Sequence, residues 1–393
     1  MFSATKFITA AAILIPLIAI ADQEPSSAAN PYGISLSGYV DVGYSKMNST
    51  GLYVGSTKAL PLGSRALDAP DARQDKNVNT LALNQVGVVV SRQPKEGLGG
   101  MLHVIGGQDA KALAAWGAGD AGGYSYDNAH SLDLTLAYLT YAMNPVTLSA
   151  GKLQTLIGAE SISNISNFNY SHSILYGPSQ PATHTGIRLN YAPADSWGLS
   201  LGVHNGWDQV PDTSGKKTIE LGFSANPSKM LSLIGSFNSG YELADGFKAP
   251  PSTVGKRQIL DLIATISATD NLTLMFNYDS ASQENALIAQ GGRSTAKWDG
   301  LAAYANYQIN DQWRTSLRGE YVNDPQGYTA GYVGVTGQTS REVNLTLAYA
   351  PVKAAEIRWE IRQDSSSQAV FLQTDGSGKD TQTSFGLEMI YKF

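Results

Sequence analysis

The segment Trp197-Gly198-Leu199-Ser200-Leu201-Gly202-Val203-His204 decides the fold, because bulky apolar residues alternate in it with small or polar ones. Successive side chains of a β-strand point to opposite faces, so this period of two places one face in an apolar medium and the other in a polar one. The same alternation recurs at 34–44, 272–279 and 343–349. The pattern therefore predicts β-strands that separate two different solvents.

About sixteen such segments follow one another from residue 34 to the C-terminus. The predicted strands are 34–46, 78–93, 98–109, 131–143, 146–156, 183–193, 196–208, 217–226, 229–243, 257–268, 271–284, 296–309, 312–324, 339–350, 355–365 and 381–393. Long polar connections, which alternate with tight turns, are predicted at 47–77, 110–130, 157–182, 209–216, 244–256, 285–295, 325–338 and 366–380. This layout is typical of an all-β, antiparallel up-and-down transmembrane barrel with short periplasmic turns and long external loops.

Composition supports a chain that contacts lipid. Charged residues make up 15% of the sequence, whereas about 25% is usual in soluble domains. After the N-terminus no stretch approaches the roughly 18 consecutive apolar residues of a membrane-spanning helix. Because the backbone must satisfy its own hydrogen bonds in a bilayer, a closed barrel is the remaining way to span it. The net charge of −6 argues against a nucleic-acid partner, and the absence of Cys excludes disulfides and thiolate metal sites.

The N-terminus predicts export. Lys6 precedes an apolar run at 7–21 that closes with Ala19-Ile20-Ala21, the small-x-small pattern of a signal-peptidase site. We therefore expect a signal peptide at 1–21, a short lead-in at 22–33 and the barrel at 34–393. The expected location is the outer membrane of a Gram-negative bacterium.

Aromatic residues near the strand ends predict the girdles that flank the apolar band of such a barrel. The predicted girdle residues are Trp197, Trp207, Trp298, Trp313, Trp359, Tyr141, Tyr191, Tyr307, Tyr321, Tyr349 and Tyr391. The last strand has apolar residues at every odd position from Phe385 and ends on an aromatic. Its final residues, Tyr391 and Phe393, resemble the C-terminal signal that outer-membrane proteins present to their assembly machinery.

If the apolar positions face lipid, then the alternate positions face the lumen and set its selectivity. The lumen candidates are Asp41, Arg188, Glu220, Asp279, Arg314, Arg318, Glu320, Arg358, Glu360 and Arg362. Two interpretations of the arginines stay open. They form basic ladders that face carboxylates across a constriction, or they belong to neutral pairs that only fill and solvate the lumen.

The 157–182 connection is the best candidate for a constriction, by analogy with the loop that general porins fold back into the lumen. Its candidate residues are Glu160, Asn167, Asn169, Tyr170 and His172, whose amide and aromatic groups suit polar, sugar-like solutes. The alternative is an external loop that merely displays Asn and Tyr.

The sequence also resembles a known family. The resemblance is carried by 84–94, by Glu96-Gly97-Leu98-Gly99-Gly100, by several stretches between 133 and 208, and by the last strand. Those stretches include Ala137-Tyr138-Leu139-Thr140-Tyr141 and Asn205-Gly206-Trp207-Asp208. These segments resemble the putative beta-barrel porin-2 (OmpL-like) family. The resemblance implies an outer-membrane pore without a defined substrate, and it supplies no catalytic residues.

The leading hypothesis is a passive diffusion channel for small hydrophilic solutes, since sixteen strands are enough to enclose an aqueous channel. Two alternatives remain: a barrel with a plugged lumen whose external loops act as an adhesin or structural surface, and an outer-membrane hydrolase. Only His204 near Asp208, and His184 near Thr183 or Thr185, suggest hydrolase sites.

We expect no enzymatic activity, catalytic residue, metal or cofactor, because the five His are isolated and no nucleophile motif occurs. The expected partners are outer-membrane lipids, the assembly machinery and small hydrophilic solutes, with a homotrimer as a candidate assembly and no nucleic acid.

Overall fold

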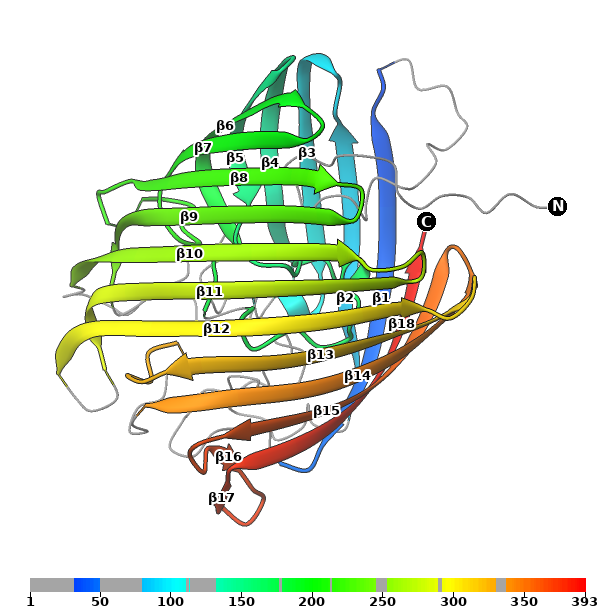
Figure 1. Ribbon diagram of the computed structural model, residues 1–393, viewed down its shortest axis with the longest axis vertical. Coiled ribbons are helices and arrows are strands. Elements are labelled where there is room, and N and C mark those ends of the chain that lie inside the picture. Colours follow the sequence, from blue (N-terminus) through cyan, green and yellow to red (C-terminus); the bar gives the residue numbers. More distant parts are fainter. Residues whose placement is uncertain are drawn as a thin grey trace.

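The computed structural model describes residues 32–49, 80–110, 113, 132–176, 179–212, 214–244, 253–288, 292–329 and 337–393. Within them the chain forms a closed antiparallel barrel in which neighbours in sequence pair with one another (Figure 1). The predicted signal peptide at 1–21 lies outside the described residues, as does the lead-in at 22–33 apart from its last two residues. No helix in the described ranges has the length and apolar character needed to cross a membrane.

Sixteen strands make up the barrel in these ranges, as the alternation predicted. They are β1 (Ser35–Met47), β2 (Thr80–Arg92), β3 (Glu96–Gly106), β4 (Leu132–Met143), β5 (Val146–Gln154), β6 (Thr183–Ala194), β7 (Trp197–His204), β8 (Thr218–Ser228), β9 (Leu231–Leu243), β10 (Val254–Ser267), β11 (Leu272–Leu287), β12 (Arg293–Gln308), β13 (Trp313–Asp324), β14 (Gln338–Val352), β15 (Ala355–Ser366) and β18 (Thr381–Lys392). A small sheet of β16 (Phe371–Leu372) and β17 (Gly378–Lys379) lies in the connection between β15 and β18. The short 3-10 helix η1 (Asn164–Ser166) lies between β5 and β6.

Some strand ends differ from the prediction for a reason that lies in the backbone. The strand predicted at 196–208 ends at His204, because Gly206 and Asp208 take positive φ angles of 143° and 54°. The strand predicted at 98–109 ends at Gly106, and the following Gly107 has a φ of 120°. Positive φ angles lie outside the β region, so the strand cannot continue through these residues.

The two ends of the chain close the barrel. β1 pairs with β18, with Val40 opposite Tyr391. Gly38 and Phe393 exchange backbone hydrogen bonds of 2.8 and 2.9 Å. A Cβ on Gly38 would lie 2.5 Å from the Phe393 ring, so the closure requires a residue without a side chain at this position. The C-terminal aromatic therefore belongs to the seam, while its part in assembly stays a prediction.

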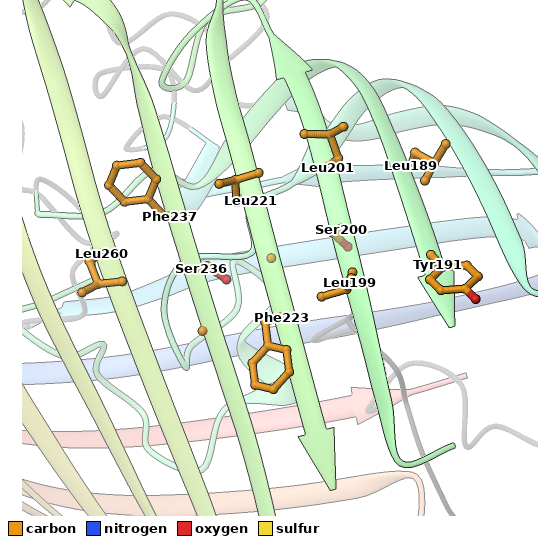
Figure 2. A pocket seen from close by; sticks show the side chains of 12 residues that line it. Leu189, Tyr191, Leu199, Ser200, Leu201, Leu221, Phe223, Ser236, Phe237 and Leu260 are labelled. Atoms are coloured by element: carbon orange, nitrogen blue, oxygen red, sulfur yellow. The ribbon is translucent and has the colours of Figure 1, made fainter. Parts of the chain in front are cut away.

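Burial alternates along the strands as the sequence pattern requires. In β7 the apolar side chains are exposed and the small or polar ones buried. A shallow groove of about 630 Å³ runs across the outer wall from β6 to β10, and most of its lining side chains are apolar (Figure 2). Leu199, Leu221, Phe223 and Leu260 are among them. An apolar wall of this extent is unfavourable in water and favourable in a lipid bilayer.

Aromatic side chains lie on the outer wall next to the short turns. Trp197 meets Tyr191 edge-on at 5.9 Å, and Trp313 stacks on Tyr349 and on Trp359 at 4.6 and 6.2 Å between ring centroids. These residues agree with the predicted girdle.

The girdle prediction is wrong for Trp207 and Trp298, which are only 8% and 1% exposed and pack together inside the barrel. Trp207 follows the positive-φ Gly206, where β7 has already ended. Trp298 lies opposite the buried Ala281 and therefore on the inner face of β12.

Candidate functional site

The inner wall carries the charged residues that the sequence predicted for the lumen. The ten candidates lie on β1 (Asp41), β6 (Arg188), β8 (Glu220), β11 (Asp279), β13 (Arg314, Arg318, Glu320) and β15 (Arg358, Glu360, Arg362). All are buried except Arg314, which keeps a small exposed fraction. Because buried charges are costly unless they are paired, their partners determine what this wall can do.

Every arginine among these candidates has a carboxylate partner. The shortest ion pairs are Arg188–Glu220 at 2.6 Å, Arg314–Glu356 at 2.7 Å, Arg358–Glu356 at 2.5 Å, Arg318–Glu160 at 2.8 Å and Arg362–Asp364 at 2.8 Å. The guanidinium fork of Arg188 donates Nε and Nη2 to the two oxygens of Glu220, and Arg314 does the same with Glu356. Each of these arginines is thus held by at least one carboxylate, while the choice between the two interpretations left open by the sequence stays a prediction.

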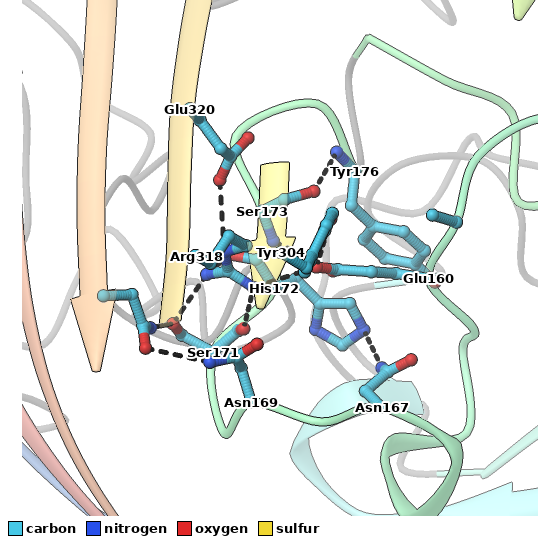
Figure 3. Close-up of polar contacts among 12 residues, drawn as sticks. Glu160, Asn167, Asn169, Ser171, His172, Ser173, Tyr176, Tyr304, Arg318 and Glu320 are labelled. Atoms are coloured by element: carbon cyan, nitrogen blue, oxygen red, sulfur yellow. Dashed lines mark hydrogen bonds and ion pairs between the residues drawn. The ribbon is translucent and has the colours of Figure 1, made fainter. Parts of the chain in front are cut away.

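Arg318 is the centre of the densest cluster (Figure 3). Its guanidinium lies within 3.3 Å of the carboxylates of Glu160, Glu320 and Glu342. It also donates to the backbone carbonyl oxygens of Ser171 and His172 at 2.7 and 3.0 Å. All five donor hydrogens of a guanidinium can thus be satisfied without water, which is what a fully buried arginine requires.

The connection between β5 and β6 runs inside the barrel. We call it the interior loop and describe it at residues 155–176 and 179–182. Glu360 of β15 accepts the backbone N–H groups of Tyr170 and Ser171 at 2.8 and 3.1 Å. Glu320 of β13 accepts those of Ile174 and Leu175 at 2.9 and 3.2 Å. Carboxylates of the wall therefore satisfy backbone donors of the loop through charge-assisted hydrogen bonds.

The interior loop also reaches the opposite side of the wall. Ser163 donates its hydroxyl to Tyr39 of β1 at 2.9 Å, and Gln85 of β2 donates to the carbonyl of Ile162 at 2.8 Å. The backbone N–H of Ala159 bonds Asn277 of β11 at 3.0 Å. Ser236 of β9 donates to the carbonyl of Leu156 at 3.0 Å. The loop is thus fixed to strands all around the barrel and crosses its interior.

The five loop candidates predicted from the sequence point into this packing. Asn169 donates to Asn344 and Thr346 of β14 at 3.0 and 2.8 Å, and Asn167 donates to the carbonyl of Ser161 at 2.9 Å. His172 stacks on Tyr176 with ring centroids 4.1 Å apart.

Tyr170 is 2% exposed and lies against Gly43 and Gly386, where added Cβ atoms would clash with its ring. Glu160 pairs with Arg318 as described above. Among the described residues of the loop, only Phe168 is well exposed, at 41%.

Asp208 fixes the end of the interior loop where it enters β6. Its Oδ1 accepts the backbone N–H groups of Ala182 and Thr183, both at 2.8 Å. Burial raises the pKa of the Asp208 carboxyl to about 7, although these two N–H donors and the more distant Lys152 and Arg257 act in the opposite direction. Asp208 is thus a buried anchor whose charge changes near neutral pH.

The two histidines considered for a hydrolase lie together on the inner wall, with partners other than those predicted for them. His204 stacks on His184 at 4.9 Å and lies 3.2 Å from Glu220, and within the described residues its ring nitrogens make no hydrogen bond to a hydroxyl. His184 contacts the Thr155 hydroxyl, Asn238 and the Gly206 carbonyl, which are not the threonines predicted for it. A general base needs a nucleophile within hydrogen-bond reach, and the hydroxyl that lies near His184 is that of Thr155 rather than that of Thr183 or Thr185.

Sequence reasoning missed several interior residues, among them Arg257 and Asp261 of β10. The inner face of this strand reads Arg257, Ile259, Asp261 and Ile263, so it is as apolar as the outer face and alternation gives no signal. Asp208 was considered only as a partner of His204. Asp208 has a positive φ of 54°, a conformation that Asp adopts more readily than most residues. This backbone conformation is the local feature that marks Asp208 as the anchor of the interior loop.

A family model described as "Putative beta-barrel porin-2, OmpL-like" matches residues 33–393. The comparison with curated proteins gives no match.

Among solved structures, the barrel is similar to the outer membrane channel DcaP of Acinetobacter baumannii, with TM-score 0.60 and 15% identity over 94% of this chain and 99% of that one. It is also similar to the trimer form of OmpT from Vibrio cholerae, with TM-score 0.59 and 14% identity over 92% and 99%. A third similar structure is an anion-selective porin from Comamonas acidovorans, with TM-score 0.56 and 11% identity over 92% and 99%. At these identities the structures establish the fold.

Proposed function

The chain belongs to the putative beta-barrel porin-2, OmpL-like family, and from this premise we propose that it is a passive channel for small hydrophilic solutes, without catalytic activity. Its place is the outer membrane, where the apolar outer wall faces lipid and the polar inner wall encloses the lumen and contacts the interior loop. The proposed constriction is the interior loop together with the charged wall of β13–β15.

One observation carries this proposal: the inner wall is lined by charged and amide side chains while the outer wall is apolar. Asp41, Glu220, Asp279 and Arg318 are each 0% exposed on the inside, and leucines at neighbouring positions are exposed on the outside. A soluble barrel with a filled core has the opposite polarity. Polar groups that face inward suit solutes that carry hydrogen-bonding groups.

Conductance tests the proposal directly. The mature chain, refolded and inserted into a planar bilayer between two KCl concentrations, should give discrete current steps and a reversal potential set by the charges of the lumen. A folded barrel that shifts on a gel after heating but gives no current would contradict the channel.

A second candidate function is favoured by the burial of the interior loop. Because the loop is fixed to strands on opposite sides, the second candidate is a closed scaffold whose external connections bind other surfaces. The conductance measurement separates the two functions, since a closed scaffold passes no ions.

The proposed assembly is a homotrimer, as in the trimer form of OmpT, to which this barrel is similar. Light scattering on the detergent-solubilised protein, corrected for bound detergent, should give three times the mass of the mature chain. A single-chain mass at every protein concentration would contradict the trimer.

A further inference from the structure

Arg257 differs from the other arginines of the inner wall because no ion pair joins it to a carboxylate within the described residues. Its Nε donates to Oε1 of Gln283 at 2.6 Å, and its Nη2 donates to the Tyr328 hydroxyl at 2.7 Å and to the Leu243 carbonyl at 3.4 Å. Nη1 has no hydrogen-bond partner there, and the side chain is partly exposed. Burial raises the pKa values of the carboxyls of Glu242 and Asp208, the charge of Arg257 lowers them, and both carboxyls also accept backbone N–H groups.

Two aromatic rings lie next to this guanidinium, and a third ring packs against both of them. Its Cζ lies 4.9 Å from the ring centroid of Trp207 and 6.0 Å from that of Tyr328. Trp298 completes the group, with centroids 6.4 Å from Trp207 and 5.5 Å from Tyr328. Cation–π contacts of this kind hold a guanidinium in place and leave its edge available for hydrogen bonds.

The cluster lies at the end of the barrel that carries the long connections. Arg257 is near the first residue of β10, Trp207 follows β7, and Tyr328 follows β13. One level further into the barrel, Ile259, Ala281 and Trp298 lie side by side on β10, β11 and β12 and form an apolar floor. The interior loop borders the same cluster, since Ile157 packs in it and the Trp298 indole N–H donates to the carbonyl of Ser179 at 3.0 Å.

We propose that Arg257, with Trp207, Trp298 and Tyr328, forms a subsite that binds small organic carboxylates carrying an apolar or aromatic group. The carboxylate accepts hydrogen bonds from Nη1 of the guanidinium, and the apolar group packs against the partly exposed Tyr328. Low local polarity strengthens the ionic contact relative to water. The subsite rests on the proposed channel, in which it would retain such solutes at the outer end.

Alternatively, the same residues have a purely structural role, in which Arg257 only links the segments after β7 and β13 to the barrel. The two roles differ in one respect, since the structural role requires the contacts with Trp207 and Tyr328 but no bound ligand. Binding of a carboxylate, compared with binding of its uncharged amide, therefore separates them.

Current block by benzoate and by benzamide, which has nearly the same shape and no charge, tests the subsite in single channels of the refolded protein. Benzoate should block at a concentration at least about tenfold lower than benzamide, a ratio that corresponds to about 1.4 kcal/mol. R257Q should abolish this preference. R257K, which keeps the charge but loses the planar fork, should retain part of it. R341Q is the matched control, because Arg341 is exposed on the outer face of β14, over the Tyr321 ring.

Equal block by benzoate and benzamide in the wild-type channel would overturn the subsite, as would an unchanged benzoate preference in folded R257Q. The wild-type comparison decides even if the Arg257 variants do not fold. If the wild-type barrel passes no current at all, the proposed channel fails, and calorimetric titration of the folded, detergent-solubilised protein with benzoate decides the subsite. Heat of binding that R257Q loses supports it, and absence of binding heat overturns it.

Discussion

Nη1 of Arg318 on β13 lies 2.8 Å from Oε1 of Glu160 in the interior loop, an ion pair that joins residues 158 positions apart inside the barrel. The same guanidinium contacts Glu320 and Glu342 of the wall. One buried cation thus holds three carboxylates from two strands and one loop together. Its removal would leave their like charges facing one another, so the loop and the wall depend on the same residue.

Replacement of Arg318 should therefore be severe. R318M removes the charge at similar length, and we expect a loss of about 3–5 kcal/mol because buried carboxylates lose their counter-ion. The measurement is the temperature at which the folded band converts to the unfolded band on a gel. R341M, on the exposed outer face, should leave that temperature unchanged. Equal midpoints for R318M and wild type would show that Arg318 does not hold this cluster together.

Loosening the interior loop should change the current rather than the fold. E360Q replaces the carboxylate that accepts the N–H groups of Tyr170 and Ser171, and hydrogen bonds to charged groups are worth about 1.5–3 kcal/mol. We expect larger fluctuations of the open-channel current in E360Q, while E96Q at an exposed position next to a tight turn should behave like wild type. If the current fluctuations of both variants equal those of the wild type, Glu360 does not restrain the loop.

The close packing of the Tyr170 ring against Gly386 of β18 gives a steric test of the loop position. A Cβ on Gly386 would lie 2.4 Å from the Tyr170 ring, whereas a Cβ on Gly319 would meet nothing closer than 3.9 Å. G386A should therefore destabilise the barrel by about 1–3 kcal/mol through overpacking, and G319A should have little effect. Heat conversion on a gel again provides the readout. If both alanine variants convert at the same temperature, the Tyr170 ring does not occupy this position.

Asp208 predicts a pH dependence of stability. Its pKa is about 7 in the folded protein against an ordinary value of 3.8, so between these values the folded state binds more protons than the unfolded state. Stability should then fall as pH rises from about 4 to about 7 and level off above that range. D208N keeps an acceptor oxygen for Ala182 and Thr183 and should flatten this part of the profile.

Thermal conversion of the folded barrel at several pH values between 4 and 8 measures this profile. D195N, at an exposed turn residue, serves as the control and should keep the wild-type slope. A D208N profile that parallels the wild type would assign the pH dependence to other groups.

The sequence by itself determined the barrel, its strand count and the inner-face position of the charged residues predicted for the lumen. Alternation is a local property, since each side chain of a strand takes the face opposite to its neighbours, and the environment of residues such as Arg188 and Glu220 follows from position alone. The outer apolar band follows from the same rule. Where the inner face is itself apolar, as along β10, the rule carries no information and Arg257 and Asp261 were missed.

Only the tertiary structure decided which charges meet and where the interior loop goes. The partners of Arg318 come from β13, β14 and a loop more than a hundred residues away, and this proximity depends on barrel closure and strand register. The positions of Trp207 and Trp298 inside the barrel likewise depend on the fold. Trp207 follows the positive-φ Gly206, and Trp298 lies on the inner face of β12 opposite Ala281. Contacts between distant segments carry no periodic signal along the chain, because they are set by the closed sheet as a whole rather than by any one strand.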